Sequence, residues 1–123
     1  FPDASFDFVV LSQTLQAVNR PDLLLDGMMR VGRNSVVSFI NFGCLDVRLQ
    51  LLFGGRMPVT ETLPTPWFET PNIHLATVRD FRLLCRAKDI SIVRQIPISS
   101  SNSFLARLMP NMFAPTCVFQ IRK

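Results

Sequence analysis

Three consecutive polar residues follow the first apolar run of the chain. Ser12, Gln13 and Thr14 come directly after residues 6–11, whose sequence FDFVVL is typical of a buried strand. Open α/β sheets bind ligands outside the carboxyl ends of their strands, so these hydroxyl and amide groups could hydrogen-bond a ligand. The same three residues could instead turn the chain and cap a short helix. The residues alone leave both interpretations open.

His74 is the only histidine of the chain, so any acid–base step by a histidine would have to use it. Glu69 is the nearest acidic residue in the sequence, and no nucleophile motif accompanies the histidine. A Ser–His–Asp or Cys–His triad is therefore not supported, and we assign no catalytic residue. The expected role of His74 is that of a structural or hydrogen-bonded loop residue.

The three cysteines lack the spacing of metal ligands, so we expect no metal site. An odd number of cysteines also fits a reducing compartment better than a disulfide framework. We therefore expect unpaired thiols in a cytoplasmic protein, with Cys85 and Cys117 in the core.

A proline-rich segment, residues 54–73, predicts a long irregular loop, and loops of this length are often functional. Arg48 and Arg56 precede or open it, Trp67 lies within it, and His74 follows it. Two arginine forks could hold a carboxylate, such as that of an amino acid. Arg and Trp are also favoured anchors of protein interfaces. The remaining interpretation is a solvated face with Trp67 packed inward. We keep these four residues as a candidate partner or substrate surface.

Strands alternating with helices must position these groups. The sequence predicts buried strands over residues 6–11, 35–40, 90–96 and 116–121. It predicts helices that start near Pro21, over residues 45–53 and after Thr77, and a helical turn in FLARLM. This order implies a largely parallel sheet, so residues 12–14 and 41–43 should lie at carboxyl ends of strands.

Local signals predict where several elements end. Leu24, Met28 and Val31 give the first helix one apolar face, and Gly32 is expected to end it in the left-handed conformation. Pro97 is expected to end the third strand.

Another signal marks the start of the helix after Thr77. Thr77 and Asp80 have the spacing of a capping box, which places Phe81 and Cys85 on the buried face of that helix.

Length and composition exclude several classes of protein. The chain has 123 residues, of which 48% are hydrophobic and 18% charged, as expected of one globular domain. No apolar run approaches the roughly 20 residues that cross a bilayer, so we expect no membrane association. The net charge is +4, but the arginines are scattered along the sequence. We therefore expect no nucleic-acid partner.

Several motifs give the chain a family resemblance. The run from FDFVVLSQTLQAV to SVVSFINFG resembles a class I S-adenosylmethionine-dependent methyltransferase fold, from its fourth strand through its fifth. LSQTLQ, VRLQLL, GRMPVT, TPNIHLATVRDFRLLC and PNMFA resemble the MetW methionine-biosynthesis family, in the correct order over nearly all of residues 1–123. Cys44–Leu45 stands where the family usually has His-Trp, which weakens any role for a family histidine there.

The resemblance implies an α/β fold of the Rossmann-like methyltransferase type, mostly parallel with an antiparallel last strand. It implies that residues 1–123 form a single domain, the C-terminal portion of that fold, without the strands that carry a Gly-rich turn. Ser12, Gln13 and Thr14 then line the place of S-adenosylmethionine in a full-length protein. We expect neither cofactor binding nor activity from residues 1–123 alone. The first strand becomes an exposed edge through which a dimer could form.

For function, the resemblance implies a role in methionine biosynthesis as the partner or activator of homoserine O-acyltransferase. The alternative is an S-adenosylmethionine-dependent methyltransferase that acts on an unidentified small-molecule acceptor. Methyl transfer often needs mainly proximity and alignment, so missing acid–base residues do not exclude it.

Overall fold

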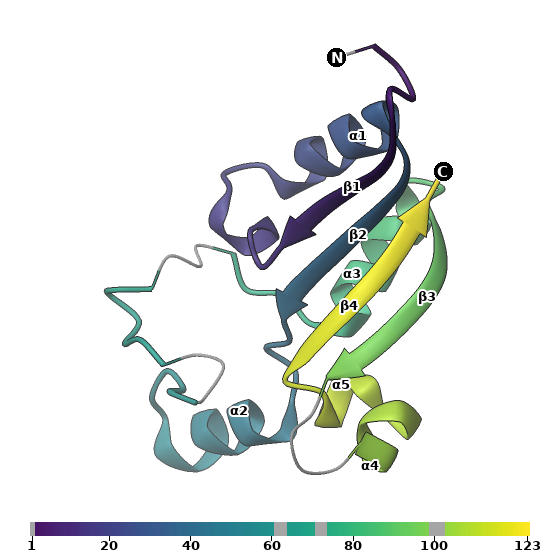
Figure 1. Ribbon diagram of the computed structural model, residues 1–123. Helices are drawn as coiled ribbons and strands as arrows, with labels where there is room; N and C mark the ends of the chain where they lie inside the picture. Colours follow the sequence, from purple (N-terminus) through teal and green to yellow (C-terminus); the bar gives the residue numbers. More distant parts are fainter. Residues whose placement is uncertain (1, 61–63, 71–73, 99–102) are drawn as a thin grey trace.

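A computed structural model describes residues 2–60, 64–70, 74–98 and 103–123. One four-stranded sheet organises these residues, in the order β1-β2-β4-β3 (Figure 1). Its strands are β1 (Phe6–Ser12), β2 (Gly32–Ile40), β3 (Ser91–Ile98) and β4 (Thr116–Arg122).

The directions of the strands confirm the predicted fold class. β1 and β2 are parallel, whereas β4 lies antiparallel between β2 and β3. β1, β2 and β3 therefore run the same way, and the last strand runs against them. The carboxyl ends of β1, β2 and β3 therefore lie at the same end of the sheet.

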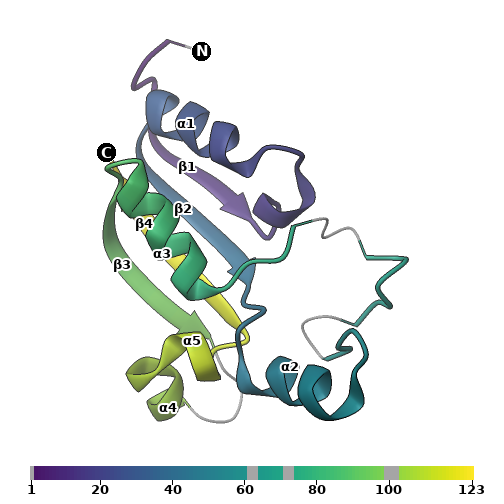
Figure 2. The ribbon, with the colours of Figure 1, turned by 180° about the vertical axis from the view of Figure 1, so that it is seen from behind.

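The helices divide into two groups. α1 (Pro21–Val31) and α3 (Val78–Ala87) cover one face of the sheet, as Figure 2 shows from behind. The shorter helices gather at the carboxyl ends of β1, β2 and β3. They are η1 (Leu15–Ala17), α2 (Leu45–Leu49), the π-helical turn η2 (Gln50–Gly54), α4 (Ser103–Leu108) and α5 (Pro110–Phe113).

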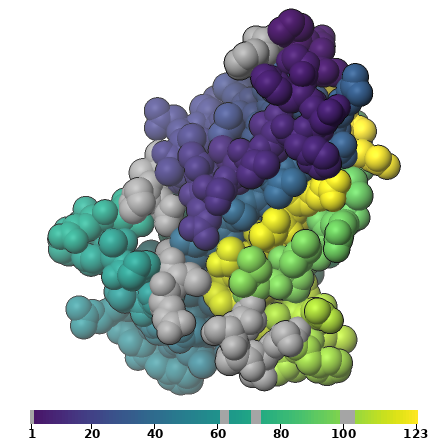
Figure 3. Space-filling model, in the orientation of Figure 1, coloured from purple at the N-terminus to yellow at the C-terminus, as the bar shows by residue number. Residues whose placement is uncertain are grey.

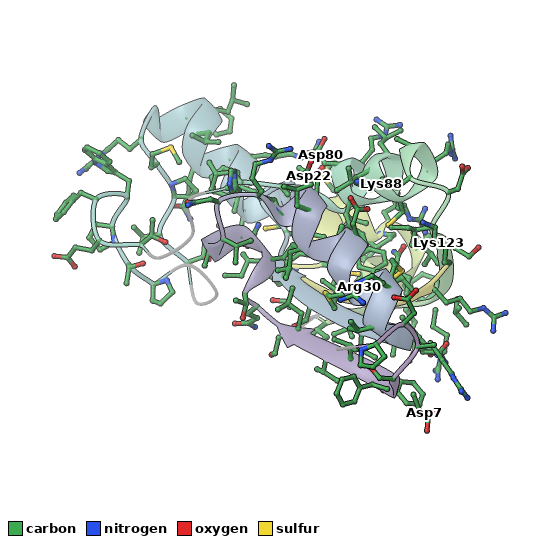
Figure 4. The ribbon with its side chains drawn as sticks, turned by 90° about the horizontal axis from the view of Figure 1, so that it is seen from above. Asp7, Asp22, Arg30, Asp80, Lys88 and Lys123 are labelled. Atoms are coloured by element: carbon green, nitrogen blue, oxygen red, sulfur yellow. The ribbon has the colours of Figure 1, made fainter. Side chains whose placement is uncertain are left out.

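The main core lies between the sheet and the helices α1 and α3. Three phenylalanines from β2, α3 and β4 form its centre, with ring centroids 4.6 to 5.7 Å apart: Phe39, Phe81 and Phe119. Burial of each such side chain stabilises the fold by about 1.5–3 kcal/mol. Lys88, which caps α3 and is labelled in Figure 4, donates hydrogen bonds to both carboxylate oxygens of Asp26 in α1 at 3.0 Å.

The capping box at the start of α3 is confirmed. The Thr77 hydroxyl oxygen accepts a hydrogen bond from the Asp80 amide at 3.1 Å, and the Asp80 carboxylate accepts one from the Thr77 amide at 3.1 Å. These bonds satisfy donors that the first turn of a helix otherwise leaves unpaired. Phe81 and Cys85 lie on the buried face of α3, as predicted.

The predicted apolar face of α1 is right at Met28 and in part at Leu24, which packs half-buried against the core, but wrong at Val31. Its buried residues are Leu25, Met28 and Met29, whereas Leu24 and Val31 are only half-buried. The side chains at i, i+3 and i+4 fill the core more completely than the predicted i, i+4 and i+7 set.

The predicted left-handed end at Gly32 is also wrong. Gly32 is extended, with φ −112° and ψ 139°, and it begins β2. A Cβ atom at this position would lie 2.6 Å from Cγ2 of Val9 in the adjacent strand β1. Close strand packing, and not backbone handedness, therefore requires glycine here.

Pro97 does not end the third strand, because β3 continues to Ile98 and pairs Pro97 with Cys117. β3 is an edge strand of the described sheet. An edge strand tolerates proline, since one of its sides has no hydrogen bonds to lose.

The predicted helix over residues 45–53 is confirmed by α2 and η2. The described residues 55–60 and 64–70 of the proline-rich segment contain neither helix nor strand, also as predicted. The rest of that segment, residues 61–63 and 71–73, lies outside the described residues.

Candidate functional site

Ser12, Gln13 and Thr14 lie at the carboxyl end of β1, and all three are exposed. The backbone of Gln13 adopts the left-handed conformation, with φ 51°. Its backbone N–H donates hydrogen bonds to the Ser38 carbonyl and hydroxyl oxygens at 2.9 and 3.1 Å. The Thr14 hydroxyl donates to the Ser12 carbonyl at 2.9 Å. These bonds form the turn that the sequence allowed, but the Thr14 side chain does not cap η1, which was the other part of that interpretation. The side chains of Ser12 and Gln13 face solvent.

This turn does not by itself fit S-adenosylmethionine. Three exposed side chains at one strand end supply at most one wall, whereas cofactor sites enclose most of their ligand. No carboxylate is among them to bind a ribose hydroxyl. A hollow lined by Leu15, Phe39, His74 and Phe81 has a volume of about 100 Å³, too small for a nucleoside.

A buried glutamine that sequence reasoning missed holds η1 against β2. Gln16 is 5% exposed, and its side-chain amide donates to the Ile40 carbonyl at 2.9 Å. Its side-chain oxygen accepts from the Ile40 amide at 3.3 Å. The side-chain amide of Gln16 thus forms with Ile40 the pair of hydrogen bonds that the backbone of a neighbouring strand would form. No local pattern marks Gln16, because its partner lies 24 residues away.

Asn41 connects three elements at the same end of the sheet. Its side chain is fully buried, and its Nδ2 lies 2.8, 3.0 and 3.3 Å from the carbonyl oxygens of Ala114, Asn111 and Pro110. Its Oδ1 accepts hydrogen bonds from the amides of Gly43 and Val78 at 3.0 and 3.2 Å. Asn41 was predicted to lie at a strand end, which is confirmed, but its contacts are structural.

His74 is hydrogen-bonded to backbone on two sides. Its Nε2 donates to the Asn19 carbonyl at 2.9 Å, and its amide donates to the Gln16 carbonyl at 2.9 Å. A carbonyl oxygen only accepts, so Nε2 carries the proton in this arrangement. The residue therefore ties the segment before α3 to the turn after β1. This is the hydrogen-bonded loop position that the sequence favoured.

The two candidate arginines line different grooves. Arg48 donates from Nε to the Gly43 carbonyl at 2.6 Å and lines a groove of about 610 Å³ beside α3. Arg56 lines a second groove of about 570 Å³ with Leu49 and Phe53. The structure does not bring the two guanidinium groups into one carboxylate clamp.

Trp67 belongs to a set of exposed apolar side chains on η2 and the proline-rich segment. It is 71% exposed, so the inward-packed interpretation is wrong, and its ring meets that of Phe68 edge-on with centroids 5.7 Å apart. We call the following residues the apolar lobe: Leu52 (74% exposed), Phe53 (80%), Trp67 and Phe68 (68%). This part of the chain projects from the sheet in Figure 3. Contiguous exposed apolar patches mark interaction sites, and in this set the structure shows one ring contact, that between Trp67 and Phe68.

The three cysteines are free and buried, which confirms the prediction for Cys85 and Cys117. Burial raises the pKa of both of these thiols to about 11, so they are protonated and unreactive at neutral pH. Among the described residues, no three His, Cys, Asp or Glu side chains gather as metal ligands would.

None of the helices in the described ranges is long and apolar enough to cross a membrane.

The sequence profile of the family described as "Methionine biosynthesis protein MetW" matches residues 1–121, nearly the whole chain. The chain belongs to the MetW family. The family resemblance of the sequence motifs is therefore confirmed.

A curated relative of this MetW chain is the "Bifunctional methionine biosynthesis protein MetXA/MetW" of Rhodopirellula baltica. The two are 32% identical over 126 residues, which cover all of this chain and 20% of the relative. The chain thus spans about a fifth of the length of the curated relative it matches.

A solved structure, that of the small RNA methyltransferase HEN1, shares the fold of this MetW chain. The TM-score is 0.56 at 13% sequence identity, and the match covers 95% of this chain and 14% of the other. At this identity the likeness shows the fold alone, and it confirms the predicted methyltransferase-like fold.

Proposed function

We propose that this MetW chain acts in methionine biosynthesis as the partner or activator of homoserine O-acyltransferase. The support is the relative in Rhodopirellula baltica, whose name joins MetXA and MetW in one polypeptide. In this proposal the MetXA part is the acyltransferase, and fusion keeps the two at a high effective concentration. A pair that is fused in one organism is expected to associate as separate chains in another.

The apolar lobe is the docking surface in this proposal, and its exposure is the observation that carries it. Phe53 and Trp67 are 80% and 71% exposed, although side chains of this size gain about 1.5–3 kcal/mol each when buried. Arg56 lies beside Phe53 in the adjoining groove and supplies a charged rim. Aromatic anchors with a polar rim are the composition of a protein interface. The free, buried cysteines support a cytoplasmic setting for the complex.

The second candidate is an S-adenosylmethionine-dependent methyltransferase that acts on a small-molecule acceptor. The shared fold supports it, but Ser12, Gln13 and Thr14 lack an enclosing site, as described above. On this alternative, further parts of a full-length protein would complete the cofactor pocket. Residues 1–123 alone should then still bind no cofactor, which calorimetry with S-adenosylmethionine can test.

Co-purification with homoserine O-acyltransferase tests the partner proposal. We expect a stable complex with the full-length protein, and we expect Phe53→Ala with Trp67→Ala to weaken it at least tenfold. Arg33→Ala is the matched control, because Arg33 is an exposed residue of β2, remote from the lobe, whose ion pair with Asp7 is also exposed. No complex, or equal weakening by the control, would contradict the proposal.

A further inference from the structure

Four arginines line the groove of about 610 Å³ beside α3, and together we call them the arginine groove: Arg48, Arg79, Arg82 and Arg86. Arg79, Arg82 and Arg86 follow one another at i, i+3 and i+7 along α3, so they share one side of that helix. Arg48 enters the same groove from α2. Two separate elements therefore direct positive charge into one hollow.

Within the described part of the chain, these charges have no acidic partner. The ion pairs that the structure shows there involve Arg20, Arg30, Arg33 and Lys88, and no carboxylate is among the residues lining the groove. Four like charges in one concave surface create a strong positive potential that attracts anions.

Hydrogen bonds to uncharged acceptors hold two of the guanidinium groups in place. Arg48 Nε donates to the Gly43 carbonyl at 2.6 Å, and Arg82 Nε donates to the Gln95 side-chain oxygen at 2.7 Å. These bonds use one N–H of each group and leave the others available. The groove is therefore partly pre-organised for an anion.

The remaining lining residues are largely apolar and include Leu83, Met109 and Met112. Methionine side chains adapt to flat organic groups, and the volume falls within the range of small-molecule sites. Arg79 and Arg86 are seven residues apart, or about 10 Å along the helix. That span fits two or more anionic groups on one molecule better than a single small anion.

We propose that the arginine groove binds a small organic anion that carries two or more phosphate groups and a flat aromatic ring, as a nucleoside triphosphate does. Arginine forks match phosphate oxygens in pairs, and all four cations here are arginines. The apolar residues of the groove hold the ring of the ligand. This proposal does not depend on the acyltransferase partnership.

Calorimetric titration of the full-length protein with ATP and with pyrophosphate tests this proposal. We expect saturable binding of both, tighter for ATP, and weaker at high salt. Arg79→Gln with Arg86→Gln should weaken ATP binding at least tenfold. Both residues are exposed and make no ion pair in the described chain, so the variant should fold, which circular dichroism verifies.

Arg94→Gln with Arg33→Gln provides the control, because it removes the same charge from exposed positions on strands. It should leave ATP binding within twofold of the original protein. Equal weakening by control and groove variants would overturn the proposal, as would the absence of saturable ATP binding. Binding of a poly-glutamate peptide without binding of ATP would also overturn it, in favour of an acidic protein segment.

Discussion

Two buried side-chain amides, Gln16 and Asn41, hold together the end of the sheet where the candidate residues lie. Gln16 pairs with the backbone of Ile40, and Asn41 joins the backbone after β2 to the segments that begin α3 and surround α5. A buried amide is costly unless its hydrogen bonds are made, so these residues specify one arrangement of the loops.

Replacing Asn41 with alanine should destabilise the protein by about 3 kcal/mol, because it leaves several buried backbone groups without partners. The free energy of unfolding in urea measures the effect. Asn19→Ala is the control, since the Asn19 side chain is exposed, and it should change stability by less than about 0.5 kcal/mol. A loss below about 1 kcal/mol for Asn41→Ala would contradict the structural role.

The buried thiols predict a dependence of stability on alkaline pH. The pKa of Cys85 and of Cys117 rises from an ordinary value of 9.0 to about 11 on folding, because burial disfavours the thiolate. Between pH 9 and 11 the unfolded chain releases protons that the folded chain keeps. Their contribution to stability is thus complete below pH 9 and is lost as the pH rises toward 11.

Urea unfolding at pH 8 and at pH 10.5 measures this loss. Cys85→Ala with Cys117→Ala lacks both groups, so its stability should fall less over the same interval. An identical fall in the variant and the original protein would show that these thiols do not titrate as described.

At the residue scale, the sequence located the strand-end residues but not their contacts. Ser12–Thr14 and Asn41 were placed correctly because they follow apolar runs, a local signal. The hydrogen bond from Asn41 to Ala114 spans 73 residues, so no local pattern could predict it. For the same reason, the sequence could not predict that Arg48 and Arg56 line different grooves.

Where α1 passes directly into β2, one close contact limits how β1 and β2 pack against each other. Gly32 begins β2 with no space for a Cβ atom against Val9, whereas Gly27 in α1 has open space around it. Substitution by alanine is therefore expected to have opposite effects on stability at these two positions.

Gly32→Ala should destabilise the protein by about 1–3 kcal/mol, because the new methyl group forces β1 and β2 apart. Gly27→Ala should stabilise it by about 0.5–1 kcal/mol, because alanine is the better helix former. Thermal unfolding measures both changes. A stabilising Gly32→Ala would mean that the strands can separate at no cost.

At the element scale, a signal contained within a few residues correctly predicted where α3 begins. The capping box at Thr77 was confirmed because its partners are three residues apart. Gly32 and Pro97 were misinterpreted because their conformations depend on neighbouring strands, Val9 of β1 for Gly32 and the edge position of β3 for Pro97. The alternation of strands and helices predicted the parallel strands, whereas the antiparallel direction of β4 was implied by the family resemblance alone.

Across the whole molecule, the two edges of the described sheet differ. β3 carries Arg94 and Pro97, which discourage pairing with another strand. β1 is more apolar, with Phe8 57% and Val10 67% exposed, and within the described residues it pairs with β2 on one side alone. We propose that residues 1–123 on their own dimerise through β1.

Val10→Lys should therefore lower the apparent mass of residues 1–123 in sedimentation experiments to that of a monomer. Val93→Lys, at an exposed position of β3, should leave the dimer intact. A monomer before any substitution, or a dimer that only Val93→Lys disrupts, would rule out association through β1.

The proposed complex should change the rate of the acyltransferase, so that rate is the quantity to measure. Purified homoserine O-acyltransferase should be assayed while full-length protein is added in increasing amounts, with the Phe53→Ala, Trp67→Ala variant in parallel. We expect a saturable change in rate with the original protein, and a shift of at least tenfold in the half-maximal concentration with the variant. A rate that stays constant at all concentrations of the original protein would contradict it.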